Sequence, residues 1–138
     1  MRKKGKKIVH CHGTYDLLHL GHIKHLTNAK KYGDILIVTI TADKFINKGP
    51  GRPYFKSRQR AESISSLQSV DYVLINHDFT ATKIIKYLRP DFYCKGPDYI
   101  NQKNDVTKEI KNEIKAIKKV GGKIVFTKDE TFSSSNLI

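Results

Sequence analysis

Two histidines, His19 and His22, stand three residues apart in a segment that could hold phosphates, residues 13–22. The segment follows an apolar pattern that begins at Ile8 and is typical of a strand, and it leads into a helical pattern. A glycine such as Gly13 lets a backbone approach a ligand closely, and the amides at a helix start attract anions. Residues three apart share one face of a helical turn, so both imidazoles would meet the same ligand. The segment therefore predicts a phosphate site at which the histidines act on the phosphates.

Two other roles are open to this histidine pair. A metal could bind both rings, although the local sequence offers no third ligand. The rings could also be hydrogen-bonded groups of the core, which is less expected at a glycine-bearing turn. The other four histidines are expected to be structural: His10, His12, His25 and His77. Of these, His12 could approach the site, and His25 is expected on a helix surface.

Polar residues also follow the later apolar runs. The loop that follows residues 35–40 contains Lys44, Lys48 and Arg52, and the helical pattern after it contains Arg60. A lysine in a glycine-rich loop can reach phosphates, and an arginine can bind them with two hydrogen bonds. These cations are therefore candidates for phosphate ligands, although a solvated loop with surface charges is the simpler alternative.

Two more segments complete the set. Residues 95–99 follow a strand pattern and should lie at the rim of the same site. Ser133, Ser134 and Ser135 stand at the start of a final helical pattern. Hydroxyl groups and free amides at such a start can bind phosphates, although serines there also cap helices.

The patterns that must position these residues alternate between strand and helix. We expect strands over residues 8–12, 35–40, 72–75, 92–94 and 123–126, and helices over residues 20–32, 57–67, 82–88 and 108–120. Such alternation predicts an α/β fold, a Rossmann-like, doubly wound, five-stranded parallel sheet with helices on both faces. Ligands of these folds bind at the carboxyl ends of the strands. Because each polar segment follows a strand, we expect all of them to form one site.

The chain as a whole fits one domain over its 138 residues. It ends about one turn into its last helical pattern, so we expect this domain to come from a longer protein. Membrane-spanning and secretory patterns are absent from the sequence, which favours a cytoplasmic protein without membrane partners. Cys11 and Cys94 lie in apolar runs and are expected to be buried, reduced thiols.

The formal net charge of +13 favours polyanionic partners. Nucleic acid, nucleotides and sugar phosphates all meet that description, and solvated lysine faces would explain the same charge. Few aromatic residues are interleaved with the basic ones, so a platform for single-stranded nucleic acid is not evident. We therefore expect a nucleotide and a small phosphorylated acceptor to bind, and not nucleic acid.

Residues 13–22 resemble the signature of the nucleotidylyltransferase superfamily that contains the cytidylyltransferases. That signature reads Gly-Thr/Ser-Phe-Asp followed by His-x-Gly-His, and the chain departs from it only at Tyr15. Class I aminoacyl-tRNA synthetases share the histidine element, but they are far longer and carry a second lysine-rich signature that is absent here. The stretch from Lys48 to Pro53, followed by Gln59 and Arg60, resembles the nucleotidyltransferase domain of ADP-heptose synthases.

The later segments extend this resemblance. Residues 95–99 are similar to the Lys-Gly-Gly-Asp-Tyr element of ADP-heptose synthases, with Pro97 in place of a glycine. The serine run looks like the Ile-Ser-Thr-Thr or Ile-Ser-Ser-Ser element that binds the triphosphate in this family. Glycerol-phosphate cytidylyltransferases have an arginine shortly before it, where this chain has Lys128.

The resemblance implies a transfer of NMP from ATP or CTP to a sugar or polyol phosphate, with release of pyrophosphate, by a magnesium-dependent homodimer. It implies catalytic roles for four residues: His19, His22, Lys48 and Arg60. It implies nucleotide contacts from eleven residues: Gly13, Thr14, Tyr15, Gly21, Lys95, Gly96, Asp98, Tyr99, Ser133, Ser134 and Ser135. It implies substrate contacts from Asp16, Lys44 and Arg52.

Within this reaction, residues 95–99 favour ATP with a heptose-like phosphate over CTP with a polyol phosphate. Two alternatives stay open. A pantetheine-phosphate or flavin-type adenylyltransferase would fit the serine run. A non-catalytic nucleic-acid-binding domain would use the positive charge.

Overall fold

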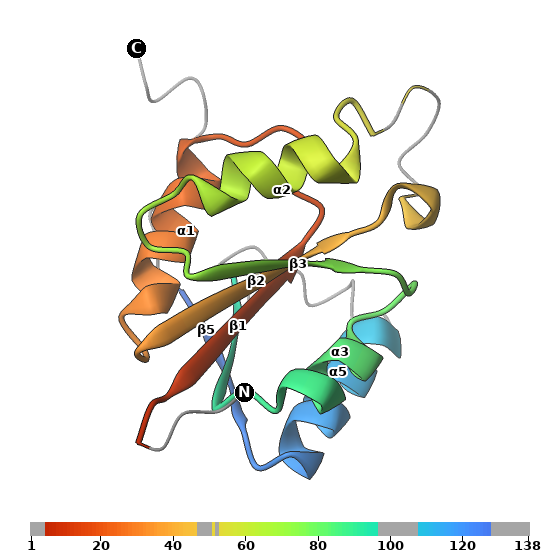
Figure 1. The fold of residues 1–138 in the computed structure, drawn as a ribbon. Coiled ribbons are helices and arrows are strands. Elements are labelled where there is room, and N and C mark those ends of the chain that lie inside the picture. The colour runs from red at the N-terminus through yellow and green to blue at the C-terminus, as the bar shows by residue number, and fades with distance from the viewer. Residues whose placement is uncertain (1–4, 47–50, 52, 97–107, 128–138) are drawn as a thin grey trace.

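Five parallel strands form one sheet in the order β3-β2-β1-β4-β5 (Figure 1). The structure, a computed structural model, describes residues 5–46, 51, 53–96 and 108–127, without the side chains of residues 108 and 109. The strands are β1 (Ile8–Gly13), β2 (Ile35–Thr41), β3 (Tyr72–Asn76), β4 (Phe92–Lys95) and β5 (Lys123–Phe126). The chain runs outward from β1 to β3, crosses back to pair β4 with β1, and then adds β5 beside β4. The predicted Rossmann-like parallel sheet is confirmed, and its topological switch point lies between β1 and β4.

Helices cover both faces of the sheet. They are α1 (Leu20–Lys30), α2 (Ser57–Ser65), α3 (Thr82–Leu88) and α5 (Lys108–Lys119), and a short 3₁₀ helix, η1 (Asp43–Phe45), follows β2. Helices α1 and α2 lie on one face, and α3 and α5 pack together on the other (Figure 1).

Strand β1 contributes alternate residues to the two cores. Val9 and Cys11 are buried with Leu26 of α1 and Ile64 of α2. On the other face, Ile8 is buried in a cluster with residues of β2 and α3. Full burial of a side chain of this size stabilises the fold by roughly 1.5–3 kcal/mol. The sheet is therefore covered on both sides, and its carboxyl edge is the edge that the polar segments follow.

Carboxylates secure the amino ends of the strands. Asp91 accepts a hydrogen bond from the backbone N–H of Ile8, and Asp71 accepts one from that of Leu36, each at 2.8 Å. These bonds satisfy amides at the edge of the sheet that is opposite to the polar segments.

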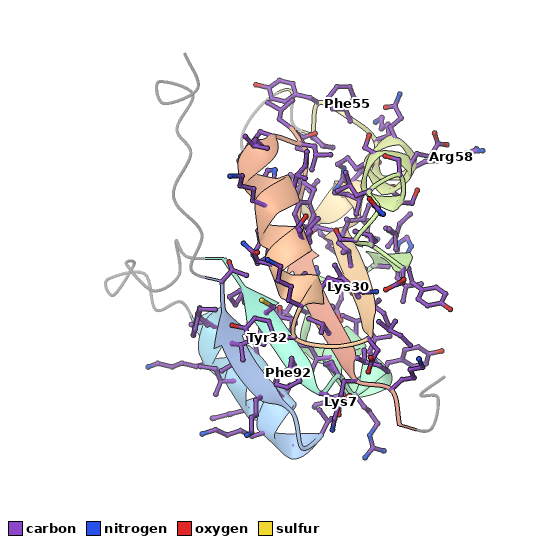
Figure 2. All side chains as sticks on the ribbon, turned by 90° about the vertical axis from the view of Figure 1, so that its left-hand side faces the viewer. Lys7, Lys30, Tyr32, Phe55, Arg58 and Phe92 are labelled. Atoms are coloured by element: carbon purple, nitrogen blue, oxygen red, sulfur yellow. The ribbon has the colours of Figure 1, made fainter. Side chains whose placement is uncertain are left out.

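The end of α1 shows why a glycine follows it. Helix α1 ends at Lys30, two residues earlier than expected, and Tyr32 packs against Phe92 of β4 with ring centroids 5.8 Å apart (Figure 2). A Cβ atom at Gly33 would lie 2.8 Å from the carbonyl oxygen of Lys7. Gly33 is therefore needed for a close approach of two backbone segments where α1 leads into β2.

Both cysteines are buried free thiols, as predicted. Cys11 of β1 and Cys94 of β4 lie on neighbouring strands and belong to the same core cluster. A hydrogen bond to Cys94, together with burial, raises the pKa of the Cys11 thiol well above its usual value.

Candidate active site

The turn that leaves β1 is built around the ring of Tyr15. This residue adopts the left-handed backbone conformation (φ 50°), and its side chain is buried. A Cβ atom at Gly13 would lie 2.8 Å from Tyr15 Cε2, so only glycine leaves room for the ring. The ring in turn meets His22 edge-on at a centroid distance of 5.2 Å. Gly13 and Tyr15 thus position His22. From the sequence, Gly13 and Tyr15 were expected only as nucleotide contacts.

His19 and His22 together cap the start of α1. Nδ1 of His19 accepts a hydrogen bond from the backbone N–H of Gly21 at 3.1 Å, and Nδ1 of His22 accepts one from the N–H of His19 at 3.3 Å. The two rings stack at 3.8 Å. A Cβ atom at Gly21 would lie 2.8 Å from Cε1 of His19, so the glycine in His-x-Gly-His makes the cap possible.

These hydrogen bonds fix where the imidazole hydrogens lie. A neutral imidazole whose Nδ1 accepts a hydrogen bond carries its hydrogen on Nε2. Both His19 and His22 therefore present Nε2–H as a donor. The first turn of α1, all of it within the described residues, carries no acidic side chain that would neutralise its positive end. Two neighbouring donors at a helix start are suited to the oxygens of a polyphosphate.

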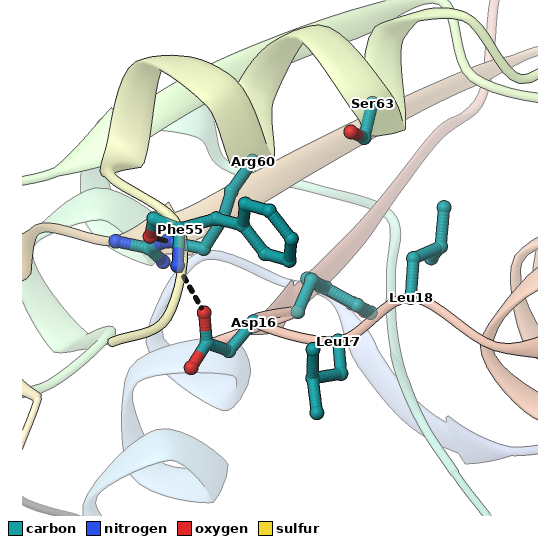
Figure 3. A pocket seen from close by; sticks show the side chains of 7 residues that line it. Asp16, Leu17, Leu18, Phe55, Arg60 and Ser63 are labelled. Carbon is teal, nitrogen blue, oxygen red and sulfur yellow. Dashed lines mark hydrogen bonds between the residues drawn. The ribbon is translucent and has the colours of Figure 1, made fainter. Parts of the chain in front are cut away.

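Asp16 holds a loop instead of reaching outward. Its Oδ2 accepts a hydrogen bond from the N–H of Tyr54 at 2.8 Å. Its Oδ1 accepts one from the N–H of Phe55 at 2.9 Å (Figure 3). The side chain is buried. This placement differs from the expected substrate contact, because both carboxylate oxygens are occupied by backbone amides that precede α2.

Arg60 is likewise turned into the protein. Its Nε, Nη1 and Nη2 donate to the carbonyl of Phe55 at 2.9 Å, the carbonyl of Thr14 at 2.8 Å and Oδ1 of Asp43 at 2.7 Å. The residue is 1% exposed. The expected phosphate ligand is therefore, in this structure, a buried link between α2, η1 and the turn after β1. Asp43 was missed by sequence reasoning, although an acid two residues after β2 in a basic loop was a usable signal.

A cavity of about 260 Å³ lies between this turn and α2 (Figure 3). Its lining includes the apolar side chains of Leu17, Leu18 and Phe55. Asp16 and Arg60 also border it, and the hydrogen bonds described above join both of them to the backbone around it.

Lys95, at the carboxyl end of β4, is directed toward α5. Its Nζ forms an ion pair with Oε1 of Glu113 at 2.7 Å, and both side chains are 6% exposed. Tyr93 donates its hydroxyl hydrogen to the other oxygen of Glu113 at 3.0 Å. In this structure Lys95, which was expected to contact the nucleotide, forms a buried pair that joins β4 to α5. Glu113 was not predicted, although it stands three residues after Ile110 and four before Ile117 on the apolar stripe of the helix.

The remaining expected site residues fall into two groups. Lys44 is exposed, with its Nζ 5.1 Å from the centre of the Phe45 ring. Gly96 lies beside His25. Nδ1 of His25 is 2.9 Å from Oγ1 of Thr127, and the residue is partly buried, whereas a place on the helix surface was expected. Seven expected site residues lie outside the described residues: Lys48, Arg52, Asp98, Tyr99, Ser133, Ser134 and Ser135.

A second cavity, of about 880 Å³, runs between α3 and α5. Five lysines are among the residues that line it: Lys83, Lys86, Lys115, Lys118 and Lys119. Part of the positive charge noted in the sequence therefore gathers on the face opposite to α1 and α2.

Within the part of the chain that the structure describes, no group of three or more His, Cys, Asp or Glu side chains could hold a metal ion. None of the helices in that part is long and apolar enough to cross a membrane.

The chain resembles known proteins over most of its length. Residues 10–138 match the family model described as cytidylyltransferase-like. The bifunctional protein HldE of Aliarcobacter butzleri is 43% identical over 121 residues (86% of this chain), and that of Nitratiruptor sp. is 42% identical over 125 residues (89% of this chain). These matches cover 25% and 27% of the relatives, so the chain spans about a quarter of their length.

Solved structures agree with the family match. A lipopolysaccharide core biosynthesis protein from Thermoplasma volcanium superposes with a TM-score of 0.75 at 32% identity, over 92% of this chain and all of that one. A pantoate-β-alanine ligase from Francisella tularensis superposes with a TM-score of 0.62 at 17% identity, over 99% of this chain and 66% of that one, and shows the fold alone. With its capped histidine pair at the start of α1, this chain belongs to the cytidylyltransferase-like family of nucleotidyltransferases.

Proposed function

We propose that this chain transfers a nucleotidyl group from ATP to a heptose-like sugar phosphate and releases pyrophosphate. The observation that carries the proposal is the cap of α1, in which Nδ1 of His19 and Nδ1 of His22 both accept backbone hydrogen bonds, so that each ring keeps its hydrogen on Nε2. The resemblance of residues 95–99 to ADP-heptose synthases supports the choice of acceptor. The similarity to the lipopolysaccharide core biosynthesis protein agrees with a sugar substrate.

In the proposed reaction, an oxygen of the acceptor phosphate attacks the α-phosphorus of ATP. The bond between that phosphorus and the oxygen that bridges to the β-phosphate breaks, and pyrophosphate leaves with the electron pair. An acceptor phosphate is already ionised at neutral pH, so no general base is needed. Catalysis then consists of positioning the reactants and stabilising charge on the phosphate oxygens, which two fixed imidazole donors can do.

Magnesium enters this reaction as part of the substrate, MgATP. Mg²⁺ keeps several water ligands and is commonly bound through substrate phosphates with few protein ligands. The hydrogen bonds of Asp16 agree with that mode, because both of its carboxylate oxygens accept backbone N–H groups.

Other expected residues complete the proposal. Lys48 and the serine run, Ser133 to Ser135, would hold the phosphate tail, and Asp98 and Tyr99 would contact the nucleoside. Arg52 would contact the acceptor. We further propose that the protein is cytoplasmic and that its active form is a homodimer. Sedimentation at micromolar concentration would test whether it is a dimer.

The test of the proposed function is pyrophosphate release with MgATP or MgCTP and a panel of acceptors, namely heptose 1-phosphate, mannose 1-phosphate and glycerol 3-phosphate. We expect the pair of ATP and heptose 1-phosphate to be fastest. His19→Ala and His22→Ala should each lower the turnover by roughly 10²–10³-fold, as the loss of one preorganised donor does elsewhere. Near-normal release by either variant would contradict the mechanism, and preference for CTP with glycerol 3-phosphate would contradict the substrate assignment.

Nucleic-acid binding is the second candidate, favoured by the lysine-lined groove between α3 and α5. It predicts RNA or DNA affinity that falls steeply with salt, together with no pyrophosphate release from any triphosphate. Fluorescence anisotropy with a labelled RNA at two salt concentrations separates it from the enzyme function.

A further inference from the structure

A chain of polar side chains crosses the sheet on the face that α3 and α5 cover, and the roles given above do not use it. Oγ1 of Thr39 lies 2.7 Å from Nε2 of His10 and 2.7 Å from Nδ1 of His12. His10 and Thr39 are completely buried, whereas His12, one residue before the end of β1, is partly exposed. The ring of His10 meets that of Tyr93, which belongs to the core cluster of α3 and α5. Because side chains two apart on a strand share a face, His12 projects on the same side.

The single hydroxyl hydrogen of Thr39 can be donated to only one of the two rings. If it went to His10, the hydrogen of that ring would sit on Nδ1, which is buried and has no hydrogen-bond partner among the described residues. If His10 instead donates from Nε2 to Thr39, only a lone pair is left at Nδ1. Buried N–H groups without an acceptor are the rarer case, which favours the second arrangement. Thr39 then donates to Nδ1 of His12, and His12 carries its hydrogen on Nε2.

The Nε2 atom of His12 lies at the carboxyl edge of the sheet. It is 3.5 Å from Oγ1 of Thr41, the last residue of β2. Burial and the nearby charge of Lys95 lower the pKa of His12 to about 4, so the ring is neutral at neutral pH. The side chain therefore offers a neutral N–H donor, held from behind by Thr39, at the edge where ligands of such sheets bind.

The two histidines of the α1 cap and His12 come from opposite faces of the sheet. His19 and His22, which are proposed to hold the ATP phosphates, come from α1 on one face, whereas His12 comes from the other face. In an in-line displacement, the attacking oxygen and the leaving pyrophosphate lie on opposite sides of the α-phosphorus. The acceptor therefore approaches from the side away from the triphosphate tail.

We propose that His12 binds the phosphorylated sugar acceptor through its Nε2–H, and that Thr39 is a positioning residue that fixes this hydrogen on Nε2. This inference rests on the proposed nucleotidyl transfer and adds a specificity-determining contact to it. The ligand atom is an acceptor oxygen, either of the phosphate or of a sugar hydroxyl.

The first test needs no substrate. Long-range ¹H–¹⁵N correlation spectra of the histidine rings distinguish Nε2–H from Nδ1–H tautomers. We expect His12 to be the Nε2–H tautomer in the unmodified protein, and we expect a mixture in Thr39→Val. An Nδ1–H tautomer in the unmodified protein would overturn the inference, whether or not the protein is active.

The second test is kinetic, with MgATP and heptose 1-phosphate. His12→Phe keeps a flat ring but removes the donor, and it should raise the KM of the acceptor about 10-fold or more. The KM of ATP should stay within about twofold of the unmodified value, a split that general distortion of the sheet would not produce. His12→Asn, which retains an N–H donor, should recover part of the loss.

His10→Phe is the matched control. His10 lies on the same strand as His12, and its replacement also removes a hydrogen bond to Thr39 but leaves His12 in place. We expect it to leave the acceptor KM within about twofold, and thermal unfolding confirms that each variant is folded. Thr39→Val should raise the acceptor KM several-fold and add nothing to His12→Phe. An unchanged acceptor KM in His12→Phe, or equal increases in both KM values, would overturn this inference while leaving the transfer reaction intact. Absence of pyrophosphate release by the unmodified protein with every pair would overturn both.

Discussion

Replacing Arg60 by methionine should destabilise the protein before any substrate is bound. The guanidinium is buried and donates to two backbone carbonyls and to Asp43. Methionine keeps much of the apolar stem but leaves these three acceptors without their donor. A ligand that waited for phosphate would behave in the opposite way, because removing a cation that has no protein acceptor costs the free protein little.

The magnitude follows from the partners. Removing one member of a buried ion pair costs about 3–5 kcal/mol when the other charge is left dehydrated. The side chain of Asp43 is 32% exposed, so water would hydrate part of its charge and reduce that figure. Each carbonyl that loses a charged donor adds about 1 kcal/mol or more. We therefore expect a loss of about 3 kcal/mol, which for a chain of this length lowers Tm by about 10 °C.

The assay is thermal and urea unfolding of the substrate-free protein, with Arg58→Met as the matched control. Arg58 lies two residues earlier on the same helix, and its side chain is 91% exposed, with Glu62 3.8 Å away (Figure 2). Such a surface pair contributes less than about 1 kcal/mol, so Tm should barely change. If Arg60→Met unfolded within about 2 °C of the unmodified protein and lost only ATP affinity, Arg60 would be a phosphate ligand and the structural role argued here would be wrong.

Three further predictions test the geometry of the site and the core. Gly21→Ala should lower turnover about 100-fold, because the added methyl group displaces the His19 ring, and should change Tm little, because alanine favours the helix. Pyrophosphate release checks the turnover, and thermal unfolding checks Tm. The free energy of unfolding should fall as pH drops from about 6.5 toward 4, by up to about 1 kcal/mol per pH unit for His12. Burial is the chief cause that lowers the folded-state pKa of His12 to about 4, so in this pH range the unfolded chain binds a proton that the folded protein does not. Urea titrations of His12→Asn should show a shallower dependence, and an identical slope would refute this assignment. Iodoacetamide should leave Cys11 and Cys94 unmodified in the native protein and alkylate both in urea, because both thiols are buried and the pKa of Cys11 is raised. Mass spectrometry would show the labelling, and rapid labelling of the native protein would contradict the burial.

The sheet could be predicted from the sequence because its signals are local. The apolar run over residues 35–40 is typical of a strand covered on both faces, and the structure extends it only to Thr41. The parallel direction of the strands also follows from their alternation with helices. The strands and helices of the described residues therefore lie close to where the periodicity placed them.

The directions of the long polar side chains could not be predicted in the same way. Arg60 lies on the helix after the loop, as the pattern predicted, but its guanidinium binds acceptors that distant segments supply, namely the carbonyl of Thr14 and the carboxylate of Asp43. Lys95 shows the same effect, because its partner Glu113 is contributed by α5. Residue type and spacing fix which loop a cation occupies, whereas the fold decides what the cation binds.

These buried polar groups give the site its rigidity. Asp16 binds the residues that precede α2, and Arg60 returns from α2 to the carbonyl of Thr14, so the turn after β1 is held from both ends. The turn delivers the chain to the cap of α1, where backbone amides orient His19 and His22. A reaction that needs no covalent step from the protein depends on donors whose positions are already set before substrate binds. Residues that never touch a substrate can therefore govern turnover as strongly as the histidines do, and a loss of activity in an Arg60 or Asp16 variant identifies a ligand only when the stability of the free protein is unchanged.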